Sequence, residues 1–336
     1  MKALLIGGTG TISTAVSRLL VLRGWDVYVL NRGNRNDVLP EGIHSLQGDV
    51  RNEESMRTAL SDETFDVVCE FIGFVPEHVS QDIRVFNGRC GQYIYISSAS
   101  AYHKPVADFR ITEGTTLSNP YWKYSRDKIA CEQILRQAIE ECGFPATIVR
   151  PSHTYDERSV PVAVHGNFGS WQVLDRIRQG KPIIIHGDGS SLWTVTHNSD
   201  FAKAFVGLMG NPKAIGEAFH ITSDESLTWN QIMEMTAHAL GKELKVCYVP
   251  ASILAKAPQY DFTGALLGDK ACSVVFDNTK VKKLVPDFIC TTPFCKGVQI
   301  AVDHILSHPE LQKPDPEFDA FSDRLIAAMK GVEAVL

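Results

Sequence analysis

The sequence predicts an α/β fold in which a doubly wound parallel sheet is joined to a smaller C-terminal lobe. Three observations support this prediction. Short apolar runs alternate with helical segments over the first 150 residues, the first run leads into a glycine-rich turn, and the pattern becomes irregular after Arg150. Strands that alternate with helices are typical of parallel sheets with right-handed crossovers. At 336 residues, the chain can form one large domain with an embedded lobe.

The apolar pattern places each element of the first 150 residues. Short continuous apolar runs predict strands that are buried on both faces, and apolar residues at helical spacing predict the helices between them. Gly24 and Gly143 end the first and last of these helices. The predicted strands cover residues 2–6, 27–30, 43–46, 67–72, 93–97 and 146–150, and the predicted helices cover 12–23, 52–61, 76–88 and 122–142.

The bulk composition argues against several classes of protein. The chain is 44% hydrophobic and 21% charged, its pI is about 6.0, and its apolar runs are too short to span a bilayer. The N-terminal apolar run enters a glycine turn directly, which predicts a strand and not a signal peptide, so we expect a cytoplasmic protein. A net charge of -6 argues against a nucleic-acid partner and favours a small-molecule ligand. Eight scattered cysteines predict reduced thiols and no metal site.

A glycine-rich turn lies between the first strand and the first helix. Residues 7–13 read Gly-Gly-Thr-Gly-Thr-Ile-Ser. Glycines at this place let the backbone turn tightly and approach a pyrophosphate at the helix N-terminus. The turn therefore predicts a Rossmann-type dinucleotide-binding domain over residues 1–150, in which Gly7, Gly10, Thr11 and Ile12 bind the cofactor. Residues 151–336 are expected to form mainly a substrate-binding lobe, with segments that return to the main sheet.

The end of the second strand indicates which dinucleotide is bound. An acid there binds the ribose 2′-hydroxyl of NAD, whereas an arginine accommodates the 2′-phosphate of NADP. The sequence has Asn31 and Arg32 at this point, with Arg35 nearby, so it favours NADP over NAD unless Arg32 is simply a solvated surface residue. Asp49 follows the third strand, where it can either reach the adenine or cap the next helix.

Tyr124 and Lys128 lie four residues apart at the start of a predicted helix, which places them on one face. A free tyrosine has a pKa of about 10 and is a poor base at neutral pH. A neighbouring lysine and a cationic nicotinamide favour the phenolate and make the tyrosine a useful acid or base. Ser98 ends a strand at the carboxyl edge of the sheet, where ligands of open α/β sheets bind, and its hydroxyl can hold a substrate oxygen.

These features appear in the order typical of extended or atypical short-chain dehydrogenases/reductases. The glycine turn, Ser-Ser-Ala-Ser-Ala-Tyr at 97–102, the Tyr-x-x-x-Lys pair and Arg150-Pro151 resemble the NAD-dependent epimerase/dehydratase family up to about residue 290. The resemblance implies that Ser98 binds the substrate oxygen, that Tyr124 is the acid/base and that Lys128 orients the cofactor ribose. Ala99-Ser100 replace the Asp-Glu pair of the family's sugar-nucleotide dehydratases, which argues against that reaction.

Two residues depart from the family pattern on the substrate side. Trp193 stands where many members carry an arginine that grips a nucleotide diphosphate, so a UDP-sugar substrate becomes doubtful. Trp193 could stack on a substrate ring or could belong to the core. His153 stands where sugar-nucleotide epimerases often carry a substrate-contacting asparagine, and it either binds substrate or is satisfied by the backbone.

The sequence therefore predicts an NAD(P)-dependent oxidoreductase or epimerase that acts on a secondary alcohol of a carbohydrate or sugar derivative by tyrosine-assisted hydride transfer. Two alternatives remain open. The loop 31–33 also resembles RNA-binding plastid stem-loop relatives of this fold, and a dinucleotide-sensing regulator without catalysis would resemble negative regulators of nitrogen metabolism, which lack the Tyr-x-x-x-Lys pair. The family resemblance also implies a possible homodimer formed through helices 76–88 and 122–142.

Overall fold

The computed structural model describes residues 1–33 and 39–335, so Arg35 lies outside the described residues. Strands and helices alternate along the first 151 residues. The strands are β1 (Lys2–Ile6), β2 (Asp26–Asn31), β3 (Ile43–Gln47), β4 (Phe65–Glu70), β5 (Cys90–Ile96), β6 (Arg110–Ile111), β7 (Ala146–Pro151), β8 (His153–Tyr155), β9 (Ile183–His186), β10 (Leu192–Trp193), β11 (Val195–His197), β12 (Ala218–Ile221), β13 (Leu227–Thr228), β14 (Val246–Val249) and β15 (Val275–Phe276).

The helices connect these strands and cover them. They are α1 (Thr11–Leu22), α2 (Glu53–Leu60), α3 (Pro76–Phe86), α4 (Lys123–Cys142), α5 (Trp171–Arg178), α6 (Asn198–Leu208), α7 (Trp229–Ala239), α8 (Ala251–Leu254), α9 (Thr279–Leu284), α10 (Phe294–Ser307) and α11 (Pro316–Glu333). Short 3-10 turns occupy Ala99–Ala101, Pro212–Ala214 and Pro309–Leu311, and a π-helix occupies Thr263–Lys270.

Seven parallel strands form the central sheet in the order β12-β7-β5-β4-β1-β2-β3. The chain runs outward from β1 to β3 and then returns to β4 on the other side of β1. The strand order therefore reverses between β1 and β4, and the carboxyl ends of the strands open a crevice at this point, where open α/β sheets bind ligands. The predicted fold class, a Rossmann-type doubly wound α/β sheet, is confirmed.

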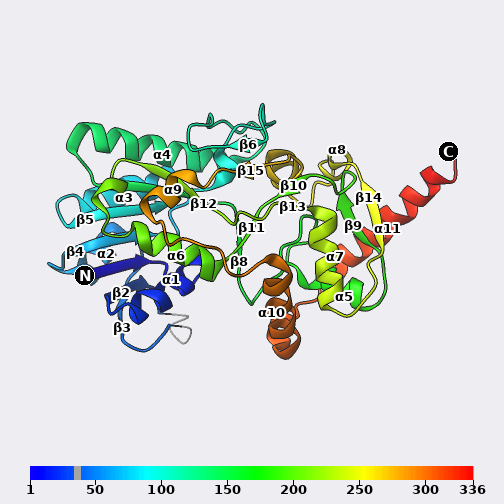
Figure 1. Ribbon diagram of the computed structural model, residues 1–336, viewed down its shortest axis with the longest axis horizontal. Coiled ribbons are helices and arrows are strands. Elements are labelled where there is room, and N and C mark those ends of the chain that lie inside the picture. Colours follow the sequence, from blue (N-terminus) through cyan, green and yellow to red (C-terminus); the bar gives the residue numbers. More distant parts are fainter. Residues whose placement is uncertain (34–38, 336) are drawn as a thin grey trace.

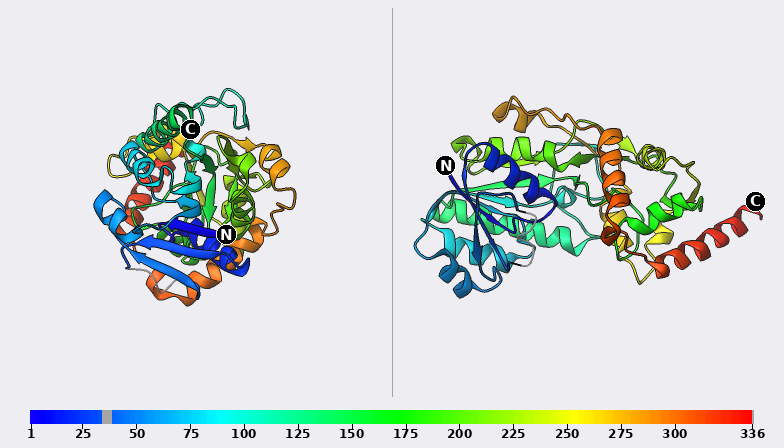
Figure 2. Two further views of the ribbon diagram at one scale, coloured as in Figure 1. Left: turned by 90° about the vertical axis from the view of Figure 1, so that its left-hand side faces the viewer. Right: turned by 90° about the horizontal axis from the view of Figure 1, so that it is seen from below.

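Helices cover both faces of the sheet because its strands are apolar on both faces. Ala3 and Leu5 of β1 pack with the apolar residues of α1 and α6, whereas Leu4 and Ile6 pack with those of α2, α3 and α4. Figures 1 and 2 show this sheet and its helices at one end of the molecule and the lobe at the other, with α11 reaching beyond the lobe to the C-terminus.

The lobe contains its own core and four small strand pairs. The pairs are β8 with β11, β9 with β14, β10 with β13, and β6 with β15. The lobe core includes Trp171, Trp193 and Trp229 and side chains of α5, α7, α10 and α11. Several segments that follow residue 151 lie on the main sheet: β12 pairs with β7 as its edge strand, α6 packs against α1, and α9 contacts α6.

The predicted strands and helices of the first 150 residues all form, with small shifts at their ends. The strand predicted over 67–72 is β4 and ends at Glu70. Its last predicted residue leaves the sheet because the Ile72 amide donates a hydrogen bond of 2.5 Å to the Glu70 carboxylate. The loop after β4 therefore turns toward the glycine turn, where Ile72 meets Gly7.

Candidate active site

The glycine turn forms one wall of a pocket at the N-terminus of α1. Gly7 has a φ of +82°, and a Cβ at this position would lie 2.7 Å from Cγ2 of Ile72. A Cβ at Gly8 would lie 2.7 Å from Cγ2 of Val29. These two glycines therefore let the turn pass closely over the sheet. The turn borders a pocket of about 270 Å³, which is lined by Gly7, Thr9, Gly10, Asn31, Arg32, Gly48, Val50 and Ile72.

Hydrogen bonds of the Ser13 side chain stabilise this turn. Its hydroxyl donates to the Gly7 carbonyl at 2.7 Å and accepts from the Gly10 amide at 2.8 Å, and the residue is only 1% exposed. The sequence indicated only that a serine is small enough for this position. The structure shows that its hydroxyl also fixes the two glycines relative to each other, which preorganises the turn.

Replacing Gly7 by alanine is expected to weaken dinucleotide binding about tenfold or more, because a positive φ costs a residue with a Cβ about 1–2 kcal/mol and the new Cβ would displace Ile72. The affinity can be measured by calorimetry. Gly24→Ala is the matched control: Gly24 has a φ of +72°, but a Cβ there meets nothing within 4 Å. An unchanged dinucleotide affinity in Gly7→Ala would contradict this role of the turn.

The other predicted cofactor residues lie at or next to this pocket. Asn31 and Arg32 line it, and Oδ1 of Asn31 accepts the Gly33 amide at 2.6 Å. Thr11 and Ile12 form the first turn of α1, where backbone N–H groups have no partner within the helix. Asp49 lies between two lining residues, but its carboxylate accepts the Arg51 amide at 2.9 Å.

A second pocket opens beside the first, at the junction between the sheet and the lobe. It has a volume of about 330 Å³ and brings together Ser98, Tyr124, His153 and Trp193, which the sequence places in four separate segments. The remaining lining residues come from both halves of the chain and are Ala99, Ser100, Trp122, Pro151, Ser152, Thr154, Asp269 and Lys270.

Tyr124 is the second residue of α4, and its half-buried side chain lines this pocket. Burial raises the pKa of Tyr124 to about 12, and a hydrogen bond with the Ser98 side chain partly opposes this rise. The Ser98 hydroxyl also lies 2.8 Å from the hydroxyl of Ser100. Tyr124 and Ser98 therefore present two hydroxyl groups to the same point, and the phenol of the unliganded protein keeps its proton at neutral pH.

Lys128 lies one turn after Tyr124 and connects the two pockets. Its Nζ donates to the carbonyls of Gly73 and Ile96, both at 2.7 Å, and lies 5.8 Å from the centroid of the Tyr124 ring. The side chain is 1% exposed, and this burial lowers the pKa of Lys128 to about 8. Gly73 directly follows Ile72, which lines the pocket at the glycine turn, so the ammonium is held between that pocket and the phenol.

A buried ion pair holds α4 against β7, and a further hydrogen bond ties it to the segment after β5. The Arg150 guanidinium donates to both carboxylate oxygens of Glu132, at 2.9 and 2.6 Å, and both side chains are 1% exposed. The Ser97 hydroxyl donates to the same carboxylate at 2.6 Å. Glu132 lies one turn after Lys128, so this network fixes the helix with Tyr124 and Lys128 relative to the end of β5.

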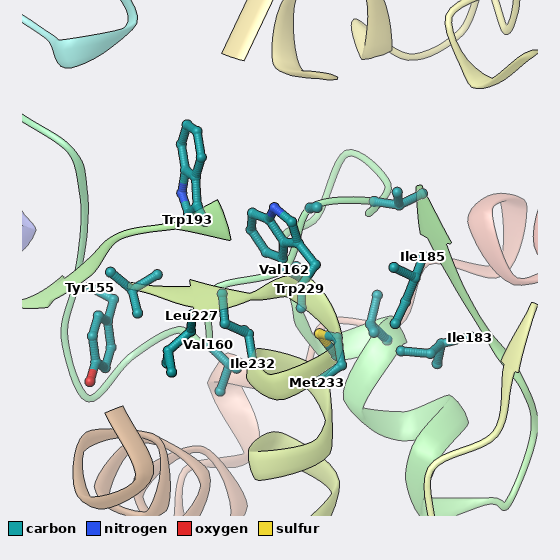
Figure 3. Packing of buried hydrophobic residues seen from close by; sticks show 14 of the residues in the cluster. Tyr155, Val160, Val162, Ile183, Ile185, Trp193, Leu227, Trp229, Ile232 and Met233 are labelled. Atoms are coloured by element: carbon teal, nitrogen blue, oxygen red, sulfur yellow. The ribbon is translucent and has the colours of Figure 1, made fainter. Parts of the chain in front are cut away.

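His153 and Trp193 line the pocket from the lobe side. Burial lowers the pKa of His153 to about 3, with a further contribution from the Lys270 charge, so its imidazole is neutral at physiological pH. Trp193 is 3% exposed and stacks on Trp229 with ring centroids 6.1 Å apart. Figure 3 shows the two indoles side by side at the edge of the lobe core. Trp193 is therefore both a core residue and a wall of the pocket.

Acid is expected to destabilise the protein through buried histidines such as His186, whose pKa burial lowers to about 4. A histidine with a lowered folded-state pKa stabilises the fold above about pH 6.5, and this stability is lost as the pH falls through the folded pKa. Buried Glu70 and Asp82 have raised pKa values and act in the opposite direction. We therefore expect the urea midpoint of unfolding to fall between about pH 7.5 and about pH 5 in both proteins, but to fall less in His186→Gln than in the wild type. An equal fall of the midpoint in the variant and the wild type would contradict this role of His186.

Asp269 and Lys270 are pocket residues that the sequence did not indicate. They end the π-helix, whose glycines accommodate the Trp122 indole: a Cβ at Gly264 would lie 2.1 Å from Cδ1 of Trp122. The Asn119 amide donates to the Gly268 carbonyl at 2.7 Å and to the Ser100 carbonyl at 2.8 Å. This contact joins the lobe to the start of α4. The pocket at the glycine turn is also lined by Thr9, Gly48, Val50 and Ile72, which were not among the predicted cofactor residues. Only their positions after strands could have indicated them.

Within residues 1–33 and 39–335, no helix combines the length and the apolar character needed to cross a membrane. All eight cysteines are free thiols, and none of them lines either of the two pockets.

Known proteins share this sequence and this fold. Residues 3–222 match the model of the NAD dependent epimerase/dehydratase family. A 2'-dehydrokanamycin reductase from Streptomyces kanamyceticus is 27% identical over 296 residues, which cover 86% of this chain and 80% of that protein. A chloroplast stem-loop binding protein of 41 kDa from Arabidopsis thaliana is 28% identical over 254 residues, covering 71% of this chain and 63% of its own length.

Solved structures show the same architecture. An epimerase from Methanothermobacter thermautotrophicus superposes with a TM-score of 0.75 at 17% identity, over 93% of this chain and 94% of that one. The predicted family and the prediction of an enzyme of the extended short-chain dehydrogenase/reductase type are confirmed. The chain belongs to the NAD dependent epimerase/dehydratase family.

Proposed function

We propose that this protein is an NAD(P)-dependent oxidoreductase or epimerase that acts on a secondary alcohol, or on the corresponding ketone, of a carbohydrate or sugar derivative. One observation carries the proposal. Tyr124, Ser98 and Lys128 meet beside a pocket that is built from the glycine turn. The names of the relatives, which include a reductase of an aminoglycoside ketone, agree with this class of reaction.

The described residues fit a nicotinamide dinucleotide. Gly7 and Gly8 let the backbone pass close to Ile72 and Val29, where a Cβ would clash, and backbone N–H groups of the first turn of α1 lie at the same turn. Lys128 uses two of its three N–H donors on carbonyls, and the third can bind a ribose hydroxyl. When bound, the nicotinamide supplies or accepts the hydride.

Tyr124 moves the proton in the proposed reaction. In reduction, its phenol donates a proton to the carbonyl oxygen of the substrate, and in oxidation the same oxygen takes the hydroxyl proton. Ser98 positions the substrate oxygen by a hydrogen bond. The nearby Lys128 ammonium stabilises a phenolate, and the Arg150–Glu132 pair holds the helix that carries both residues.

The experiment that tests the proposal starts with the purified protein. Mass spectrometry of the denatured protein identifies any retained dinucleotide, and the absorbance of the reduced nicotinamide follows hydride transfer to a panel of sugars and keto sugars. Stoichiometric turnover of the cofactor supports a reductase, whereas a retained cofactor with interconversion of epimers supports an epimerase. A protein that binds no dinucleotide would contradict the proposal.

The choice of NADP over NAD rests on Arg32, which lines the dinucleotide pocket at the end of β2. We expect Arg32→Ser to weaken NADP binding about tenfold, because the 2′-phosphate loses a charge-assisted hydrogen bond, and to leave NAD binding unchanged. Arg23→Ser is the control, because Arg23 follows α1 away from this pocket. An equal loss of affinity for NADP and for NAD in Arg32→Ser would overturn the preference for NADP.

RNA binding is a second candidate, favoured by the similarity to the chloroplast stem-loop binding protein. The net charge of -6 and the Tyr124 and Lys128 pair on one face of α4 support the enzyme instead. Filter binding of a stem-loop RNA at two salt concentrations separates the two candidates. Submicromolar, salt-sensitive binding would support the RNA-binding function.

The proposal includes a cytoplasmic protein and a homodimer. Helices α3 and α4 pack against each other on one face of the sheet, and they are the elements that the family resemblance assigns to a dimer interface. Light scattering after size exclusion tests the assembly, and a mass of about 37 kDa, that of one chain, would contradict a dimer.

A further inference from the structure

We infer that the pocket beside Tyr124 takes an uncharged polyol ring, such as a free sugar, a simple glycoside or a cyclitol, and does not take a nucleoside-diphosphate sugar. This inference rests on the proposed function and names its substrate class. Three observations carry it: the balance of charge in the pocket, the placement of the arginines, and the chemistry of the walls.

The pocket is lined by one acidic and one basic side chain, and burial raises the pKa of the acid, Asp269. Among the described residues, its charged lining side chains are Asp269 and Lys270, with Oδ2 and Nζ 3.6 Å apart. His153 adds no positive charge, because its pKa is lowered to about 3. Lys104 lies within electrostatic range of Asp269, but it is 1% exposed and does not line the pocket. Cationic donors strengthen the binding of a diphosphate, and an uncharged ligand does not need them.

The arginines of the lobe are placed elsewhere. Arg158, Arg176 and Arg178 pair with aspartates. Arg324 is exposed on α11 and borders a different surface depression. In the part of the chain that the structure describes, no guanidinium lines the pocket, and Trp193 takes the position at which the family resemblance expects one. The planar bidentate group that recognises phosphate is therefore replaced by an indole.

The walls suit a sugar ring. Two indoles, Trp122 and Trp193, can contact the apolar C–H face of such a ring, and four hydroxyl side chains can bond to its edge. The hydroxyl side chains belong to Ser98, Ser100, Ser152 and Thr154.

Asp269 and Lys270 have a specific role in this arrangement. The carboxylate accepts and the ammonium donates hydrogen bonds to hydroxyl groups away from the reacting carbon, so both groups select and orient the ring. The π-helix that carries them packs on Trp122, the residue before α4, and the two side chains line the same pocket as Tyr124.

Calorimetry with UDP and UDP-glucose tests the exclusion of nucleotides without requiring turnover. The protein is first saturated with its nicotinamide dinucleotide, so that the probes cannot occupy the dinucleotide pocket. We expect no binding of either probe tighter than about 0.1 mM. Binding of UDP or UDP-glucose below this value would overturn the inference.

Turnover tests the selection of polyols. We expect free hexoses, methyl glycosides or inositols to give a kcat/KM at least about tenfold above that of the matching UDP-sugars. Asp269→Asn and Lys270→Gln should each raise the KM for the polyol about tenfold and leave the dinucleotide Kd unchanged. Lys256→Gln, at an exposed lysine of the same lobe, is the control and should change neither value.

The outcomes separate the inference from the proposed function. Preferential turnover of UDP-sugars, or an unchanged KM in both pocket variants, would overturn the inference and leave the oxidoreductase or epimerase in place. A protein that neither binds a dinucleotide nor transfers hydride to either class of substrate would overturn the proposed function and the inference with it.

Discussion

Tyr124→Phe is expected to lower kcat about a thousandfold in either direction of hydride transfer while leaving dinucleotide affinity unchanged. The variant removes the hydroxyl that donates or accepts the proton, and a positioned acid or base of this kind contributes about 10²–10⁴-fold to the rate. The benzene ring keeps its packing against Trp122, so the fold should be unaffected. The measurement is the rate of nicotinamide oxidation or reduction at saturating substrate.

Tyr121→Phe is the matched control for this experiment. Tyr121 precedes the same helix, but it is 39% exposed and does not line the pocket. Its loss of a hydroxyl should leave kcat within about twofold of the wild type. Undiminished turnover in Tyr124→Phe would contradict the proposed mechanism, and an equal loss in both variants would point to a disturbed helix.

Glu132→Gln is expected to lower the free energy of unfolding by about 3–5 kcal/mol, because it leaves the buried Arg150 charge without its carboxylate. The Ser97 hydroxyl loses the same charged acceptor. The free energy is measured by urea unfolding at neutral pH. Because the network also orients α4, the folded fraction of the variant should show a lower kcat than the wild type.

Asp127→Asn provides the comparison on the same helix. Asp127 pairs with Lys123 at 2.7 Å, but the lysine side chain is 76% exposed. Exposed pairs of this kind contribute little, so the variant should unfold within about 0.5 kcal/mol of the wild type. A small effect of Glu132→Gln, similar to that of Asp127→Asn, would contradict the assignment of Arg150 and Glu132 as a buried structural pair.

The sequence predicts the sheet and its helices well because their signals are local. Apolar runs such as residues 2–6 are buried on both faces of a parallel sheet, and Gly143 adopts the left-handed conformation that ends α4. Local signals also predict part of the candidate site. Ser98 and His153 each follow a strand of the sheet, and the carboxyl ends of parallel strands meet at one edge.

Other features depend on contacts between distant parts of the chain. Asp269 and Lys270 reach the pocket from a π-helix that no simple periodicity marks, about 145 residues after Tyr124 in the sequence. Glu132 has the sequence appearance of a solvated helix residue, and only the approach of Arg150 on β7 shows that it is buried. The edge strand β12 has only four residues, too few for a distinct pattern.

The return of α6 and β12 to the main sheet has a consequence for truncation. A chain that stopped at residue 150 would lack the edge strand that pairs with β7 and the helix that packs on α1, so the apolar face of β1 and α1 that Phe201 and Phe205 cover would be exposed. The sheet domain and the lobe therefore both use segments that follow residue 150, and a single truncation cannot separate them. For the same reason, any closure of the lobe over a bound substrate must bend several connecting segments together.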